Sequence, residues 1–144
     1  MILISHRGNL CGAAPSKENT PGYIQEALDL GYEVEIDVWH QSDGWYLGHD
    51  EPEYKLEEQF LLKDKLWCHA KNLHALNKLL ELNVMCFWHQ SDRYTLTSNN
   101  FIWTFPGQPL SAASICVMPE RFSVGSQDLS FCAGVCSDFI AEWK

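Results

Sequence analysis

The stretch YEVEIDVW, residues 32–39, decides the fold because apolar and acidic residues alternate along it. Alternation is typical of a strand, and it places three aliphatic side chains on one face: Val34, Ile36 and Val38. The opposite face carries Glu35 and Asp37, which would repel each other inside a sheet unless a partner neutralised them. A bound divalent cation is the simplest partner. The alternative is an edge strand whose acidic face is in water.

Two helices are predicted beside this strand. Thr20 and Pro21 begin the first and Gly31 ends it, with an apolar stripe of Ile24, Ala27 and Leu28. Asn72 begins the second, in which four leucines repeat at helical spacing: Leu73, Leu76, Leu79 and Leu80. Strand, helix and strand at these lengths form a βαβ unit, which implies parallel strands joined by right-handed crossovers.

Short apolar runs rich in β-formers recur along the chain, at Met1–Ser5, Glu33–Val38, Trp45–Leu47, Leu66–Ala70, Val84–Trp88, Phe101–Phe105, Ser114–Met118 and Gly134–Phe139. The segments 105–114 and 119–128 are rich in Pro, Gly and Ser and are predicted to be loops. A full eight-unit barrel takes about 250 residues. The 144 residues therefore predict one α/β domain over residues 1–144, a minimal or incomplete (β/α) TIM-type barrel with few and short helices.

Composition excludes several classes of protein. With 46% hydrophobic and 20% charged residues the chain is globular, and its net charge of −9 argues against a nucleic-acid partner. The opening MILISH is too short for a signal peptide, and we expect no transmembrane segment and a cytoplasmic location. The six cysteines include no Cys-x-x-Cys pair, which favours reduced core thiols over a zinc site.

Several chemically active side chains follow strand ends, where barrel enzymes keep their reacting groups. His6 and Arg7 end the first strand in SHRGN, and His49 follows the turn SDG. His69 and Lys71 share a face of LWCHAKN. Two histidines can donate and accept protons near neutral pH. Arg7 can bind a phosphate through two parallel hydrogen bonds from its guanidinium group, and Lys71 can add a single positive charge.

In order along the chain, the motifs HRGN, ENT, ALDLGYEVEIDVWHQSDGWYLGHD and GVCSDF resemble those of the glycerophosphodiester phosphodiesterases. That family belongs to the phosphatidylinositol-phospholipase-C-like phosphodiesterases. The match is dense from His6 to Asp50, looser at Leu66–Asn72, and reappears at Gly134–Phe139. The ordered combination carries the resemblance, since HRG alone would not.

The resemblance implies a metal-dependent phosphodiesterase on a (β/α)-barrel, acting on a small phosphodiester or a phospholipid-derived substrate. Carried over by motif, His6 and His49 are the acid–base pair, and Glu35 and Asp37 bind the metal. The resemblance also implies Arg7 at the phosphate and Glu18 in support of the His6 loop. From the residues themselves we expect Lys71 at the phosphate and Trp103 at the substrate. In the family's route a glycerol hydroxyl attacks phosphorus, the histidines exchange protons, and water opens the cyclic phosphate.

Two departures from the family pattern leave alternatives open. His69 stands where the family has a third acidic ligand for magnesium or calcium; as a ligand it would shift the preference towards manganese or zinc. Otherwise two carboxylates and water hold the ion. The connection after Asp50 is short where the family carries a lid, which predicts an open pocket. The same fold then allows a cyclising phosphodiester lyase or a phosphate-binding protein with little turnover.

Three further expectations concern packing. Trp103 and Phe105 either wall the pocket or fill the core. With few helices to cover the sheet, we expect a homo-oligomer. The pentapeptide WHQSD occurs twice, at 39–43 and 88–92, and the second copy lacks the upstream acids. We interpret it as one turn used twice, with His40 and His89 as structural or rim residues.

Overall fold

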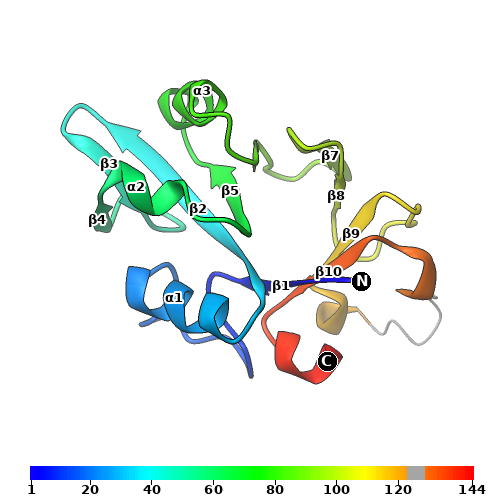
Figure 1. Ribbon diagram of the computed structural model, residues 1–144. Coiled ribbons are helices and arrows are strands. Elements are labelled where there is room, and N and C mark those ends of the chain that lie inside the picture. The colour runs from blue at the N-terminus through cyan, green and yellow to red at the C-terminus, as the bar shows by residue number, and fades with distance from the viewer. Residues whose placement is uncertain (123–128) are drawn as a thin grey trace.

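The computed structural model describes residues 1–122 and 129–144 (Figure 1). Within them the strands form one curled sheet: β1 (Ile2–His6), β2 (Glu33–Gln41), β3 (Gly44–Leu47), β4 (Tyr54–Leu56), β5 (Leu66–Ala70), β6 (Cys86–Phe87), β7 (Tyr94–Leu96), β8 (Ile102–Thr104), β9 (Ser114–Val117) and β10 (Gly134–Ser137). The helices are α1 (Pro21–Asp29), α2 (Glu58–Leu61) and α3 (Leu73–Glu81), with 3₁₀ turns η1 (Pro119–Arg121), η2 (Leu129–Phe131) and η3 (Ile140–Trp143). The α/β class and the few, short helices are thus confirmed.

A parallel run forms the body of the sheet, from β6 through β5, β2, β1, β10 and β9 to β8. Three strands pair antiparallel: β3 pairs with the end of β2, β4 pairs with β3, and β7 pairs with β8 at one end of the run. Among the described residues no ladder joins β6 to β8, so the sheet curls without closing by strand pairing. The two ends approach through Ser98, whose backbone N–H donates to the Cys86 carbonyl at 2.9 Å.

The predicted helix starts are confirmed. Thr20 accepts a hydrogen bond from the Tyr23 N–H at the start of α1, and Asn72 accepts one from the Ala75 N–H at the start of α3. After α1 the chain passes through Gly31 at φ +93°, a left-handed conformation that glycine adopts without strain. Ile24 and Ala27 are buried as expected.

The leucine stripe predicted on α3 is only partly right. The helix turns Ala75 and Leu79 to the sheet and buries them, while Leu73 is 76% and Leu80 is 55% exposed. Leu76 packs against the core at the margin. The reason is geometric: residues four apart lie on one side of a helix, and Leu73 and Leu80, seven residues apart, lie together on a different side that is turned away from the sheet.

Several short elements were missed or misjudged in length. The strands β4 and β7 and the helix α2 were not predicted, and β6 holds two residues of the five expected at 84–88. These strands carry little apolar alternation, and pairing with a neighbour defines them instead. The loop predicted at 105–114 is confirmed up to the first residue of β9. In the loop predicted at 119–128, η1 occupies the start, and residues 123–128 lie outside the described residues.

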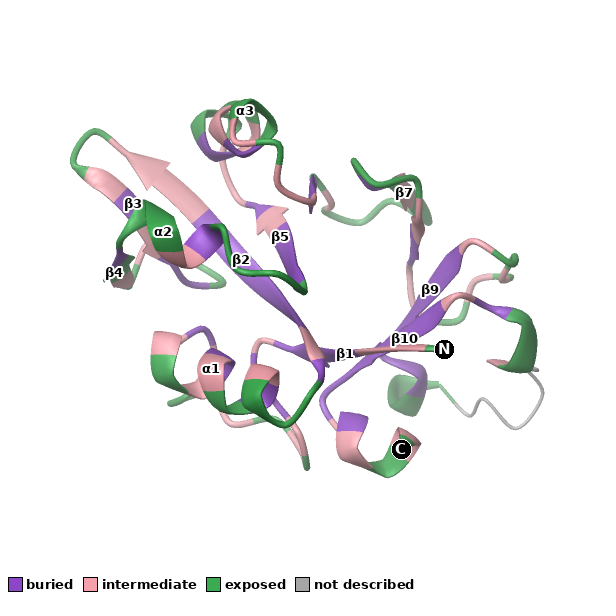
Figure 2. Cartoon of the chain, in the orientation of Figure 1, coloured by how far each residue is buried: buried purple, intermediate pink, exposed green. Residues whose placement is uncertain are grey.

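The two faces of β2 separate the core from the site. Val34, Ile36 and Val38 are fully buried in a cluster beneath α1 and α3, which lie on the outer side of the curl in Figure 1. Figure 2 shows the burial continuing along β1, β9 and β10. The inner face of β2 carries Glu35 and Asp37, so the predicted alternation is confirmed.

The interpretation of WHQSD as one turn used twice is wrong. The first copy ends β2 and turns into β3, where Gly44 adopts φ +126° and His40 pairs with Trp45. The second copy leaves β6 as irregular chain, and Arg93 stands where the first copy has Gly44. Without a glycine for the left-handed position, the hairpin turn is not repeated.

The remaining expectations concern thiols, membranes and assembly. All six cysteines are free, and five are buried, as expected of core thiols. Each helix in the described residues is too short and too polar to cross a bilayer. The homo-oligomer stays a prediction. It is favoured by large apolar side chains that are exposed on and near α3 and β7: Leu73, Leu80, Trp88 and Leu96.

Candidate active site and metal centre

A cavity of about 270 Å³ opens near the carboxyl ends of the central strands. Seven of the eight site residues predicted from the sequence line it: His6, Arg7, Glu35, His49, His69, Lys71 and Trp103. The eighth, Asp37, is fully buried directly behind the wall, in contact with Arg7, His69 and Lys71. The fold therefore brings the whole predicted set together.

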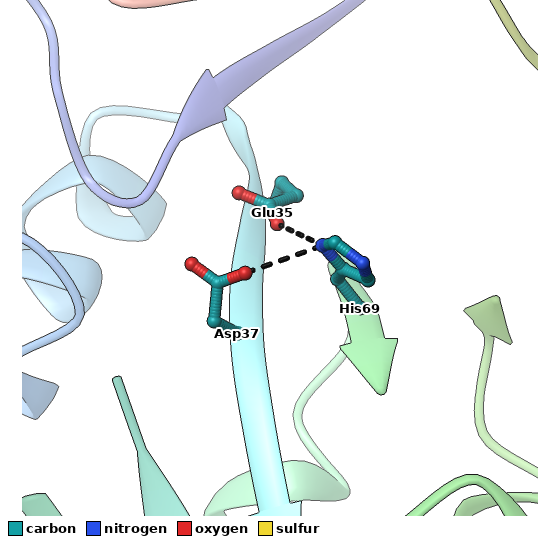
Figure 3. A group of neighbouring side chains, drawn as sticks. All are labelled: Glu35, Asp37 and His69. Carbon is teal, nitrogen blue, oxygen red and sulfur yellow. Dashed lines mark ion pairs between the residues drawn. The ribbon is translucent and has the colours of Figure 1, made fainter. Parts of the chain in front are cut away.

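The acidic pair is held on β2 against a histidine of β5 (Figure 3). Asp37 and His69 are register partners in the parallel β2–β5 ladder. His69 Nδ1 lies 3.2 Å from Asp37 Oδ1 and 3.6 Å from Glu35 Oε1. Glu35 is 2% exposed and Asp37 0% exposed, because β1 and β5 flank β2. The alternative of an edge strand with a solvated acidic face is wrong.

Two carboxylate oxygens in this cluster lack hydrogen-bond donors. Glu35 Oε2 and Asp37 Oδ1 are buried and accept no hydrogen bond from the described residues. Buried polar atoms are normally satisfied, and a buried charge requires a counter-charge. Glu35, Asp37 and His69 each offer one ligand atom, and these three atoms all lie within 4.8 Å of one another. The residues present therefore fit a small cation.

Charged neighbours keep Asp37 ionised. Burial by itself would raise the pKa of Asp37, but the His69 imidazolium, Arg7 and Lys71 hold it well below its usual range. Arg7 Nε lies 3.0 Å from Asp37 Oδ2, and Lys71 Nζ lies 3.7 Å from Oδ1. Burial likewise opposes the charge on His69, but Asp37 and Glu35 raise the pKa of His69 to about 9. In metal-free protein a proton on His69 thus supplies the missing cation.

Asn19 clamps Asp37 from the loop before α1, and sequence reasoning missed it. Its side-chain amide donates to Asp37 Oδ2 at 2.8 Å, and its carbonyl oxygen accepts from the Asp37 backbone N–H at 3.0 Å. Asn19 is buried and adopts φ +60°, a conformation that asparagine tolerates better than most residues. Its place in the ENT motif was the signal that could have found it.

His6 is oriented by the end of the last strand. Its Nδ1 donates to Asp138 Oδ1 at 2.7 Å, and Asn9 donates to the same oxygen at 2.8 Å. Burial raises the pKa of Asp138, but the contacts with His6 and Asn9 and the charge of Arg121 together outweigh burial and lower it. With the proton fixed on Nδ1, the other ring nitrogen, Nε2, has its lone pair available 3.9 Å from Glu35 Oε2. Asp138 therefore orients His6 within the site.

His49 stands at the mouth of the cavity. Its side chain is 45% exposed, and its Nδ1 donates to Asp50 Oδ1 at 2.7 Å. Two hydrogen bonds fix the backbone of the preceding Gly48: its N–H donates to the Asp37 carbonyl, and its carbonyl accepts from the Trp39 indole N–H. The backbone of β2 thus sets where His49 lies.

The conformation of Gly48 yields a stability prediction. Gly48 has φ +154°, and an added Cβ would overlap the Glu51 carbonyl oxygen. Gly48→Ala is expected to cost at least about 2 kcal/mol in unfolding free energy and to displace His49. Gly22→Ala is the matched control, since a Cβ there meets nothing within 4 Å and alanine favours the helix. Urea denaturation measures both, and equal stability of the two variants would contradict the prediction.

Several cavity residues were not predicted as functional. His89, Gln90 and Arg121 line the cavity, and the His89 carbonyl accepts a hydrogen bond from His69 Nε2 at 2.7 Å. No strand pattern marks these positions, because they follow short or irregular segments. Glu18, expected beneath the His6 loop, accepts from Arg7 at 3.2 Å and from Asn9 at 2.9 Å.

Trp103 both packs in the core and lines the cavity, the two alternatives expected for it. It is 4% exposed and packs with its ring centroid 4.6 Å from that of Phe87 and 5.9 Å from that of Trp67. The same residue lines the cavity, as does Phe105. Trp103 therefore belongs to the core and also forms part of the cavity wall.

The His69 pKa predicts how metal-free protein responds to pH. A pKa raised from 6.5 to about 9 gives stability that is fully present below 6.5 and is lost as the pH rises through 9. The loss is expected to reach at most about 3 kcal/mol. Urea denaturation with a chelator at several pH values measures it, with His69→Gln as the variant in which this pH dependence disappears. A wild-type stability that rises over this interval would contradict the assignment.

Comparison with protein-family models, curated proteins and solved structures finds no significant match for this chain. The family resemblance therefore rests on the motifs alone.

Proposed function

We propose that this chain is a metal-dependent phosphodiesterase of the glycerophosphodiester phosphodiesterase type, the family whose motifs it resembles. One observation carries the proposal: Glu35, whose buried Oε2 has no hydrogen-bond donor, lines the same cavity as the Asp138-oriented His6 and two cations. A structural ion-pair network would normally satisfy every buried carboxylate oxygen. A buried carboxylate oxygen without a donor, beside a proton acceptor, favours a functional site.

On this proposal the curled sheet is an incomplete (β/α) TIM-type barrel. Support comes from the parallel run of strands, from helices α1 and α3 on its outer face, and from a cavity near the carboxyl ends of its strands. That end is where barrel enzymes carry their active sites. The short α2 replaces a longer connection, which leaves His49 half exposed.

Glu35, Asp37 and His69 would hold a divalent ion, which when bound offsets the negative charge of the phosphate and of the transition state. Asn19 fixes the Asp37 carboxylate and leaves Oδ1 directed at His69. Arg7 and Lys71 add positive charge at the same wall, and both line the cavity while they contact Asp37. A phosphate placed there would contact the guanidinium group of Arg7 and the ammonium group of Lys71.

His6 is the proton acceptor. Asp138 holds the Nδ1 proton, so Nε2 takes the proton of the substrate's glycerol hydroxyl as that oxygen attacks phosphorus. The bond from phosphorus to the second alcohol breaks, and protonated His49 gives the departing oxygen its proton. Water then opens the cyclic phosphate, with the two histidines in reversed roles. The half-exposed position of His49 suits exchange with solvent.

The substrate is a small phosphodiester. A cavity of about 270 Å³ lies just below the usual range for small-molecule sites, so the substrate that it can enclose is small. A larger alcohol group would extend past His49, which is half exposed, into solvent. This arrangement suits a glycerophosphodiester or a phospholipid-derived headgroup ester, and the net charge of −9 disfavours nucleic acid.

The test is an assay of the purified chain against a panel of glycerophosphodiesters, with magnesium, calcium, manganese or zinc added separately. We expect release of glycerol phosphate, followed by phosphorus NMR, with His6→Asn as the inactive control. A cyclic phosphate as the final product would identify the cyclising lyase instead. Phosphate binding by calorimetry, with no turnover of any substrate under any ion, would refute the enzyme and favour the binding protein.

A further inference from the structure

The orientation of the His69 ring is fixed by its surroundings. Nε2 donates to the backbone carbonyl of His89 at 2.7 Å, and a carbonyl oxygen can only accept. The ring stacks on Phe87, with centroids 5.0 Å apart and planes 12° apart. In the neutral ring Nδ1 therefore carries the lone pair, and it points between Asp37 and Glu35. Histidines that bind metals are typically held in this way by a carbonyl behind the ring.

The oxygens available in the cluster are few. Asp37 Oδ2 is already occupied by Arg7 at 3.0 Å and by the Asn19 amide at 2.8 Å, which leaves only Oδ1 for an ion. Glu35 adds its carboxylate, and His69 adds nitrogen. Calcium prefers six to eight oxygen ligands, and magnesium prefers oxygen and water at short range. An oriented imidazole suits zinc and iron. Manganese binds carboxylate oxygens as magnesium does, but as a transition ion it accepts an imidazole nitrogen more readily, so a mixed set favours it over magnesium and calcium.

We propose that the Glu35–Asp37–His69 centre selects divalent transition ions of the manganese and zinc class over magnesium and calcium, with His69 Nδ1 as the selecting ligand. This inference rests on the metal centre of the proposed function and names its class of ion. The His89 carbonyl is the positioning group, which gives the second WHQSD segment a role that its sequence did not indicate.

Isothermal titration of the metal-stripped chain with manganese and with magnesium, at one pH and ionic strength, tests the inference. We expect the ratio of manganese to magnesium affinity to fall at least about tenfold in His69→Glu, which converts the donor set to oxygen alone. His69→Gln, which removes the nitrogen without adding charge, is a second variant in case three carboxylates prevent folding. His74→Glu makes the same change at an exposed position on α3 and should leave the ratio unchanged.

A spectroscopic measurement adds a readout independent of affinity. Pulsed electron spin resonance of bound manganese should show coupling to an imidazole nitrogen in the wild type and in His74→Glu, and no coupling in His69→Glu or His69→Gln. An unchanged affinity ratio in both His69 variants, absence of nitrogen coupling in the wild type, or no manganese binding would each overturn the inference.

These outcomes are separable from those of the proposed function, because they are measured without substrate. Selective manganese binding with no phosphodiesterase activity would support this inference and refute the enzyme. Phosphodiesterase activity that is equal with magnesium and manganese, together with equal affinity for the two ions, would support the enzyme and refute this inference.

Discussion

Replacing His6 by asparagine is expected to lower kcat by about 10²–10⁴-fold, the range for loss of a general acid or base. The expected loss follows from the Asp138 contact, which leaves Nε2 as the proton acceptor in the cavity. KM should change little, because Arg7 and Lys71 still bind the phosphate. Steady-state kinetics on a glycerophosphodiester measures both constants.

Two companion variants make the His6 result specific. His74→Asn removes a histidine outside the cavity and should keep full activity. Asp138→Asn keeps the shape of the orienting group but loses its charge, so the pH–rate profile should shift while the protein still folds. If His6→Asn turned over substrate at the wild-type rate, His6 would have no role in proton transfer.

Replacing Asp37 by asparagine is expected to abolish metal binding and to destabilise the fold by about 3–5 kcal/mol. Asp37 is the common partner of three cations, Arg7, His69 and Lys71, and the change leaves them facing one another without their shared anion. In the wild type the pKa of Asp37 is lowered from its ordinary value of 3.8. The resulting stabilisation is fully present at a pH above 3.8 and is lost as the pH falls below it.

Calorimetry with manganese and urea denaturation measure the two effects of Asp37→Asn separately. Asp43→Asn is the control, since Asp43 lies on the exposed β2–β3 turn and its partners, Tyr46 and Lys55, are exposed contacts. Normal metal affinity in Asp37→Asn would remove Asp37 from the ligand set. Unchanged stability would mean that the three cations do not depend on it.

Much of the fold could be predicted because simple periodicities were obeyed. The two faces of β2 follow the alternation in YEVEIDVW, and both helix starts follow from the capping residues Thr20 and Asn72. The site residues converge because parallel strands bring their carboxyl ends together, so motifs far apart in sequence reach one cavity.

What could not be predicted depends on tertiary pairing. Asn19 and the His89 carbonyl act through their distance from Asp37 and His69, which no local pattern encodes. The strands β4 and β7 exist because β3 and β8 pair with them. The repeated pentapeptide shows the same dependence, since identical residues form a hairpin turn in one context and irregular chain in the other.

Diffraction from crystals soaked in manganese, recorded with anomalous scattering and compared with metal-free crystals, tests the central claim most directly. We predict one strong anomalous peak within coordination distance of Glu35, Asp37 and His69 Nδ1, with the His6 and His49 rings facing it across the cavity. A peak elsewhere, such as among Glu18, Asp50 and Glu51, or no peak at saturating manganese, would contradict the account.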